Sequence, residues 1–287
     1  MNLRKLAPAP VQVGGRHLAL RIGELTAERR PLPDFLVIGA QRSGTTSLFR
    51  ALMAHPRIER ANLHKGVNYF DIHYDRGERW YRAHFPMRQD DDGVRVFDAS
   101  GYYMFHPLAA ERIVGDMPQV KVIAMVRAPE ERAFSAFKHE LARGFEWERD
   151  FGRALDLEQS RLAGEVERMR ADPSYYSFNH RHHGYQARGE YARLLEPFVT
   201  GLGRERVLVV ESERFFSEPE SCYRDIVEFL DVPGFTPASF ERYNARPSAD
   251  MDPGLRSRLV SHFESHDEAL AALLGRDPVW RRKGVTA

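Results

Sequence analysis

Short apolar runs alternate with helical patterns along this chain. Phe35–Gly39 is an uninterrupted apolar run that ends at a glycine, and this pattern is typical of a parallel strand buried on both faces. Similar runs predict three more strands, over 94–98, 120–126 and 206–211. Apolar residues at helical spacing predict a helix after each strand, over 45–55, 107–114, 129–141 and 220–230.

This alternation predicts an α/β fold with a P-loop-like central parallel sheet flanked by helices. Residues from about 145 to 200 are polar, helical in pattern and rich in aromatic and histidine side chains, which predicts a helical cap beside the sheet. Residues 1–33 are rich in proline, glycine and arginine, and we expect an arm that wraps the domain or is partly flexible. Residues 34–287 then form one domain.

Composition excludes several classes of function. The 42 basic and 41 acidic residues leave a net charge of +1, which provides no global field for nucleic acid, so an anion site must be local. The single cysteine, Cys222, excludes an internal disulfide and a cysteine-rich metal site. No run approaches the roughly 20 apolar residues of a membrane span, and the N-terminus does not resemble a signal peptide. We therefore expect a cytoplasmic protein without a membrane span.

The first strand leads into a glycine-rich turn that is suited to a phosphate. Gly39 and Gly44 have the spacing of a nucleotide-binding loop, and the helix that follows adds the positive end of its dipole. A P-loop NTPase needs Lys directly after the second glycine, where this chain has Thr45. The cation of this loop is Arg42, which suits a leaving phosphate whose charge grows during transfer. A P-loop nucleotide kinase is therefore disfavoured, although it stays the alternative.

Residues 35–48 resemble the 5′-phosphosulfate-binding segment of sulfotransferases, and the similarity is closest to heparan sulfate sulfotransferases and their bacterial relatives. Arg42 stands where most of that branch has Lys, and tyrosylprotein sulfotransferases have Arg there. Residues 126–137 are similar to the 3′-phosphate-binding motif of the family, in which Arg127 and Ser135 hold the phosphate. Weaker similarities extend the resemblance to about residues 34–280.

The resemblance implies the donor 3′-phosphoadenosine 5′-phosphosulfate (PAPS), the product adenosine 3′,5′-bisphosphate and a cap on the acceptor side. The residues expected to bind the donor are Arg42, Ser43, Gly44, Thr45, Thr46, Ser47, Arg127 and Ser135.

The catalytic residues are less evident. Arg42 and Lys65 are expected to stabilise the charge of the transferring group. In the related branch a Glu that follows this Lys is the general base, but here that position is Gly66, and Ala99 stands where a supporting Lys is expected. The candidate bases are His64, Asp98 and His106. His64 ranks first because the pKa of an imidazole suits a base near neutral pH.

No metal is expected, since His180, His182 and His183 lack the partners of a metal motif. We interpret these three histidines as a solvated or substrate-facing loop. Several aromatic residues of the cap suit a sugar face or a lipid-like acceptor: Trp147, Tyr175, Tyr176, Phe178 and Tyr185. The expected acceptor is a hydroxyl or amine of a small molecule, glycan or glycolipid. A catalytically impaired nucleotide-binding homologue is a second alternative because of Gly66. The oligomeric state stays open.

Overall fold

The computed structural model describes residues 18–62, 65–87, 93–241, 243 and 250–281. Five parallel strands form one sheet in the order β2-β3-β1-β4-β5. The strands are β1 Phe35–Gly39, β2 Ile58–Arg60, β3 Arg95–Ala99, β4 Lys121–Val126 and β5 Val207–Glu211. The predicted parallel sheet is therefore confirmed, and the four predicted strands are present within about one residue at each end. Strand β2 was not predicted, because only Ile58 of its three residues is buried.

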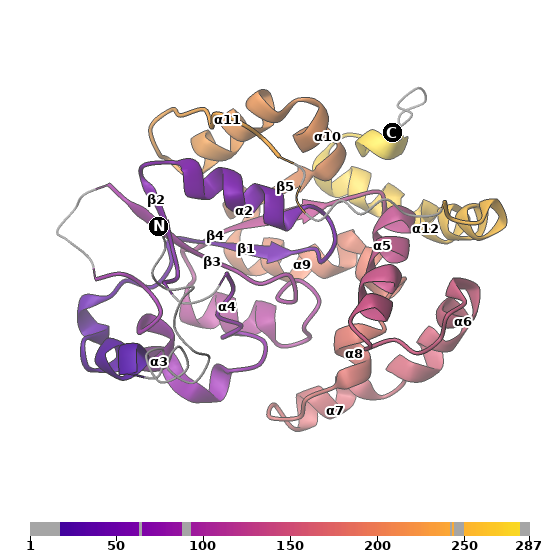
Figure 1. The fold of residues 1–287 in the computed structure, drawn as a ribbon, viewed down its shortest axis with the longest axis horizontal. Coiled ribbons are helices and arrows are strands. Elements are labelled where there is room, and N and C mark those ends of the chain that lie inside the picture. Colours follow the sequence, from indigo (N-terminus) through magenta and orange to yellow (C-terminus); the bar gives the residue numbers. More distant parts are fainter. Residues whose placement is uncertain (1–17, 63–64, 88–92, 242, 244–249, 282–287) are drawn as a thin grey trace.

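Helices cover both faces of the sheet (Figure 1). Alternate residues of β1 point to opposite sides, since Phe35 and Val37 belong to one apolar cluster and Leu36 and Ile38 to the other. The helices against the first cluster are α2 Thr45–Ala54 and α11 Pro219–Phe229. Those against the second are α4 Ala109–Asp116 and α9 Tyr191–Leu202. Burial on both faces explains why the strands read as continuous apolar runs.

The helix α5 Pro129–Ala142 extends from the sheet toward the cap, whose helices are α6 Phe151–Leu162, α7 Glu165–Ala171 and α8 Phe178–His182. Phe137 of α5 packs with Phe151 and Leu155 of α6 in a third apolar cluster. The expected cap boundary near residue 200 is wrong. Helix α9 packs Leu195 and Phe198 into the same cluster as the sheet residues, so it belongs to the layer that covers the sheet.

The N-terminal arm is helical over 18–25 within its described part. Its next turn, η2 Ala27–Arg29, lies against α3 Gly77–Arg82, where Arg82 donates a hydrogen bond of 2.7 Å to the carbonyl of Arg30.

The remaining helices are α10 Ser212–Ser217 and α12 Pro253–Leu274. The hydrophobic pattern does not predict α12, although it is the longest helix in the described ranges. Its buried positions form a sparse stripe that includes the polar Asp267. None of the described helices is both long and apolar enough to cross a bilayer.

Candidate functional site

Two strand-to-helix turns lie side by side at the carboxyl edge of the sheet. Strand β1 leads through residues 40–44 into α2, and β4 leads through 127–128 into α5. Because β1 and β4 are neighbours in the sheet, both turns open at the same edge, where α/β proteins bind their ligands. The Nε of Arg42 donates a hydrogen bond of 3.1 Å to the Oγ of Ser135. The two predicted phosphate motifs therefore form one site.

The loop backbone has the conformation of an anion-binding turn. Arg42 and Gly44 have φ values of 72° and 88°, and α2 begins at Thr45 with its N–H groups directed to the loop. Thr45 and Thr46 are half-buried, whereas the side chains of Ser43 and Ser47 are enclosed by protein. The Oγ of Ser47 accepts a hydrogen bond of 3.0 Å from the amide of Tyr243. Any contact of these two serines with a donor would therefore use backbone N–H groups.

Arg127 lies at the turn after β4, with its backbone held in place. The hydroxyl of Tyr191 donates to the Arg127 carbonyl at 2.7 Å, and the Arg127 guanidinium pairs with Glu131 at 3.4 Å. Lys138, one turn after Ser135 on α5, is a further cation that the motif comparison missed. Burial lowers its pKa, and Arg127 and Arg42 lower it further because their positive charges are close.

Lys65 lies beside the phosphate loop. Its Nζ donates a hydrogen bond of 3.0 Å to Oγ1 of Thr46 in the first turn of α2. Burial lowers the pKa of Lys65 to about 8, with a further contribution from the charge of Arg50. The other candidate on this loop, His64, lies outside the described residues.

Gly66 is pressed against the end of β3. A Cβ added at this position would lie 2.4 Å from the carbonyl oxygen of Ala99, which is far closer than real contacts allow. The absence of a carboxylate here is therefore tied to the path of the backbone. A glutamate at position 66 needs a shift of one of the two segments.

Asp98, one of the candidate bases, is enclosed by protein. Its side chain is fully buried, and its carboxylate accepts hydrogen bonds from the amides of Val67 and Ala99 and from the hydroxyls of Tyr81 and Tyr103. Burial raises its pKa despite these bonds. A carboxylate enclosed by four protein donors fits a structural role that holds the Lys65 loop against β3, and it is poorly placed to take a proton from an acceptor.

The other histidines that the sequence analysis singled out, His106, His180, His182 and His183, are buried. Burial lowers the pKa of His106 to about 3, with further contributions from Arg112 and Arg181, which leaves it a weak base. The interpretation of His180, His182 and His183 as a solvated or substrate-facing loop is wrong, since they lie on and just after α8 with at most 8% exposure. Each ring bonds to its own partners, because the cap folds back onto α5 and onto the segment after β3.

A polar network that sequence reasoning missed joins the phosphate loop to the cap. Gln41 donates to Glu140 of α5 at 3.1 Å and accepts a hydrogen bond from Arg188. The second carboxylate oxygen of Glu140 bonds to His182 at 2.9 Å. Burial by itself would raise the pKa of Glu140, but the hydrogen bond and charge of His182 hold it below its ordinary value. In the sequence, Glu140 is only one polar residue of the predicted helix over 129–141, and its burial becomes evident only in the structure.

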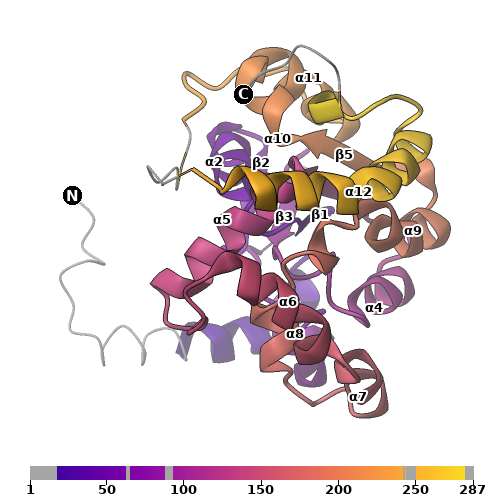
Figure 2. The same ribbon diagram turned by 90° about the vertical axis from the view of Figure 1, so that its right-hand side faces the viewer.

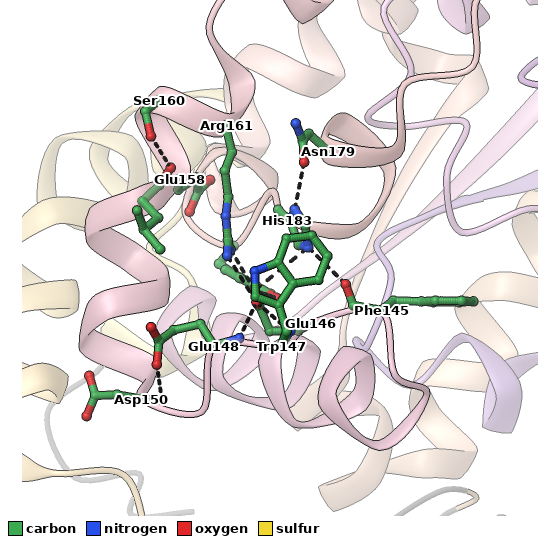
Figure 3. Close-up of polar contacts among 12 residues, drawn as sticks. Phe145, Glu146, Trp147, Glu148, Asp150, Glu158, Ser160, Arg161, Asn179 and His183 are labelled. Carbon is green, nitrogen blue, oxygen red and sulfur yellow. Dashed lines mark hydrogen bonds and ion pairs between the residues drawn. The ribbon is translucent and has the colours of Figure 1, made fainter.

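The cap has an ion pair of its own in its interior (Figure 3). Glu146, with a fully buried side chain, accepts hydrogen bonds of 2.7 and 3.1 Å from Arg161 and one of 2.9 Å from the hydroxyl of Tyr185. The same carboxylate accepts a hydrogen bond from the amide of Trp147, a residue that is 68% exposed. The pair therefore fixes the backbone that presents this tryptophan at the surface.

Comparisons with known proteins agree with this geometry. Residues 32–251 match the family model described as "Sulfotransferase domain". A solved sulfotransferase from Alicyclobacillus acidocaldarius is 32% identical, with a TM-score of 0.63 over 88% of this chain and 100% of its own. The match excludes the kinase alternative.

Two curated relatives are more distant. Membrane-associated sulfotransferase kil1 of Dictyostelium discoideum is 24% identical over 87% of this chain and 67% of its own length. Bifunctional heparan sulfate N-deacetylase/N-sulfotransferase 2 of Homo sapiens is also 24% identical, over 93% of this chain. The chain spans only 32% of the length of that human protein. With a family match over most of its length and two phosphate motifs joined in one site, the chain belongs to the sulfotransferase family.

Proposed function

We propose that this protein transfers a sulfuryl group from PAPS to a hydroxyl or amine of a small-molecule, glycan or glycolipid acceptor. The contact between Arg42 and Ser135 carries the donor assignment, because it joins a 5′-phosphate loop to a 3′-phosphate motif. A donor with phosphates at the 3′ and 5′ positions of one ribose suits such a site. A nucleoside triphosphate fits less well, because this loop lacks the lysine that holds a terminal phosphate in P-loop NTPases.

The transfer forms a bond between the acceptor atom and sulfur and breaks the bond between sulfur and the 5′-phosphate oxygen. Adenosine 3′,5′-bisphosphate leaves, and its growing negative charge needs cations that are already in place. Arg42 lies in the loop, and Lys65 lies beside Thr46. We propose that Arg42 and Lys65 stabilise this charge and that Arg127 and Ser135 hold the 3′-phosphate.

For the acceptor proton we retain His64 as the proposed base, because it precedes Lys65 in the chain. The rival among the described carboxylates is Asp71. Burial raises the pKa of Asp71 to about 6, although its hydrogen bond from Ser100 opposes the shift. Asp71 is 4% exposed, however, so it is poorly placed to meet an acceptor from solution.

The acceptor class rests on the cap. Of its five aromatic candidates, Tyr185 is fully buried, whereas Trp147 and Tyr176 are 68% and 49% exposed. The guanidinium of Arg181 lies 5.6 Å from the ring centre of Tyr176 and 5.4 Å from that of Tyr102. Exposed aromatic rings beside a cation suit a sugar face or a polar headgroup.

The test is transfer of radiolabelled sulfate from PAPS to a panel of simple phenols, oligosaccharides and glycolipids, with adenosine 3′,5′-bisphosphate followed as the second product. Labelled product from one class identifies the acceptor. If the bisphosphate binds tightly but no member of the panel is labelled, the impaired homologue becomes the better description. If it does not bind, the proposed donor site is wrong.

A further inference from the structure

Three side chains from two separate elements converge where the segment before α9 meets α12. His262 and His266 lie one turn apart on α12, and Glu190 is the residue just before α9. One ligand atom from each lies within 4.8 Å of the other two. Helices α9 and α12 are in contact, and Figure 2 shows them as neighbours. We propose that these three residues form a binding site for a divalent transition-metal ion, with Zn²⁺ as the best fit.

The donor set favours this class of ion. Two imidazoles and one carboxylate are typical ligands of Zn²⁺, Ni²⁺ and Cu²⁺, whereas Mg²⁺ and Ca²⁺ prefer oxygen ligands alone. Two ligands bound about 2.1 Å from a tetrahedral ion lie about 3.4 Å apart. Closing from 4.8 Å needs only rotations of exposed and half-buried side chains, and a water molecule can take the fourth position.

The backbone holds the ligands in this arrangement. A Cβ added at Gly189 would lie 2.6 Å from the ring of Phe263, so the segment before α9 is pressed against α12 between the two histidines. Side chains at i and i+4 of a helix share one face, which places both imidazoles toward Glu190. Within the part of the chain that the structure describes, neither imidazole makes a hydrogen bond, so the ring nitrogens are available.

The neighbouring charges compete only weakly with a metal ion. Arg193 pairs with Glu190 at 2.6 Å, but its side chain is 58% exposed, and such surface pairs contribute little. Arg258 is engaged by Asp156 at 2.7 Å. A divalent ion that also gains two nitrogen ligands would displace Arg193 from the carboxylate.

A bound ion would connect α9 to α12 beside the donor site. Glu190 follows Arg188 by two residues, and Arg188 donates to Gln41 of the phosphate loop. The ion would therefore stabilise the start of α9, which holds Arg188 in place. This role is structural and requires no metal in the transfer reaction.

Calorimetric titration of the metal-depleted, tag-free full chain with ZnCl₂ tests the proposal. We expect one ion per chain. Even an outer-shell partner is worth about 10-fold in metal affinity, so His262→Asn, His266→Asn and Glu190→Gln should each weaken binding by about 10-fold or more. Glu264→Gln is the matched control, since it removes the same charge from an exposed position of α12, and its affinity should equal that of the unmodified chain.

Two further measurements guard against indirect effects. The tetrahedral Co²⁺ complex should absorb in the visible range, and this absorption should disappear in His262→Asn. Because His262 is exposed, its replacement should not unfold the protein, so misfolding would not explain the loss of absorption. A 100-fold excess of Zn²⁺ over its dissociation constant should raise the Tm by about 5 °C. The proposal is wrong if millimolar Zn²⁺ does not bind, or if binding is unchanged in both histidine variants. Neither result bears on donor binding.

Discussion

The Nε of Arg42 lies 3.1 Å from the Oγ of Ser135, although the two residues are 93 positions apart in the chain. Arg42 belongs to the loop after β1 and Ser135 to the helix after β4. Their contact exists because β1 and β4 are adjacent in the sheet, and it brings the two predicted phosphate motifs together in the proposed donor site.

This relationship predicts how the donor product binds. In the proposed donor site, Arg42→Ala removes a positive charge beside the phosphate, whereas Ser135→Ala removes a hydroxyl donor that carries no charge of its own. We expect affinity for adenosine 3′,5′-bisphosphate to fall by about 10- to 100-fold for Arg42→Ala and less for Ser135→Ala. Calorimetry measures both constants. Arg153→Ala, on an exposed face of α6, is the control and should bind like the unmodified protein. Unchanged affinity in both site variants would refute the assignment.

The lowered pKa of Lys65 predicts a pH dependence. With a pKa of about 8, the ammonium is charged below pH 8 and loses its charge as the pH rises through that value. If Lys65 acts as a cation, kcat/KM should fall above about pH 8, and Lys65→Arg should remain active to higher pH because a guanidinium keeps its charge. A rise in kcat/KM through pH 8 that Lys65→Arg abolishes would instead identify Lys65 as the base.

The proton acceptor is tested by the acid side of the same pH profile. If His64 is the base, His64→Asn should lower kcat by about 100-fold or more and remove the acid limb of the profile. Asp71→Asn should leave the shape of the profile unchanged. If Asp71→Asn removed the acid limb and His64→Asn left it unchanged, Asp71 would be the base.

The position of Gly66 predicts that the carboxylate of related enzymes cannot simply be restored. Gly66→Glu should not raise activity, and it should destabilise the fold by about 1–3 kcal/mol because its Cβ collides with the Ala99 carbonyl. Chemical denaturation measures the loss. Gly115→Ala is the control, since it lies in α4 with open space around it and should stabilise the protein by about 0.5–1 kcal/mol. A stable and more active Gly66→Glu variant would contradict this explanation.

The buried pair of Glu146 and Arg161 predicts that the cap depends on one carboxylate. Glu146→Ala leaves Arg161 without its partner and should cost about 3–5 kcal/mol. Denaturation followed by tryptophan fluorescence measures the effect, because Trp147 lies beside the pair. Glu167→Gln, at an exposed position of α7, should change nothing.

Acid titration gives an independent check of this pair. Burial opposes ionisation of Glu146, but bonds from Arg161 and from backbone amides hold its pKa below the ordinary value of 4.5. Its stabilising contribution is therefore complete above pH 4.5 and is lost as the pH falls through the lower folded-state pKa. Glu146→Ala should lack this part of the acid transition. An identical acid transition in both proteins would exclude the contribution.

The sequence by itself determined the features that depend on neighbouring residues. Continuous apolar runs predicted four of the five strands, because burial on both faces of a parallel sheet leaves no room for polar positions. The two phosphate motifs were also evident from the sequence. The spacing of the loop glycines and the separation of Arg127 from Ser135 each depend on only one turn and one helix.

Only the tertiary structure decided which of these local features meet. The sheet order brings Arg42 to Ser135, and the path of β3 leaves no space for a side chain at Gly66. The tertiary structure also encloses Asp98, which the sequence offered as a candidate base, and buries His180, His182 and His183, which the sequence placed in a solvated or substrate-facing loop. The convergence of Glu190 with His262 and His266 is also invisible to a motif search, because its ligands come from separate elements. Hydrophobic periodicity indicates which face of a helix or strand is buried. Which other element packs against that face depends on the arrangement of the whole chain.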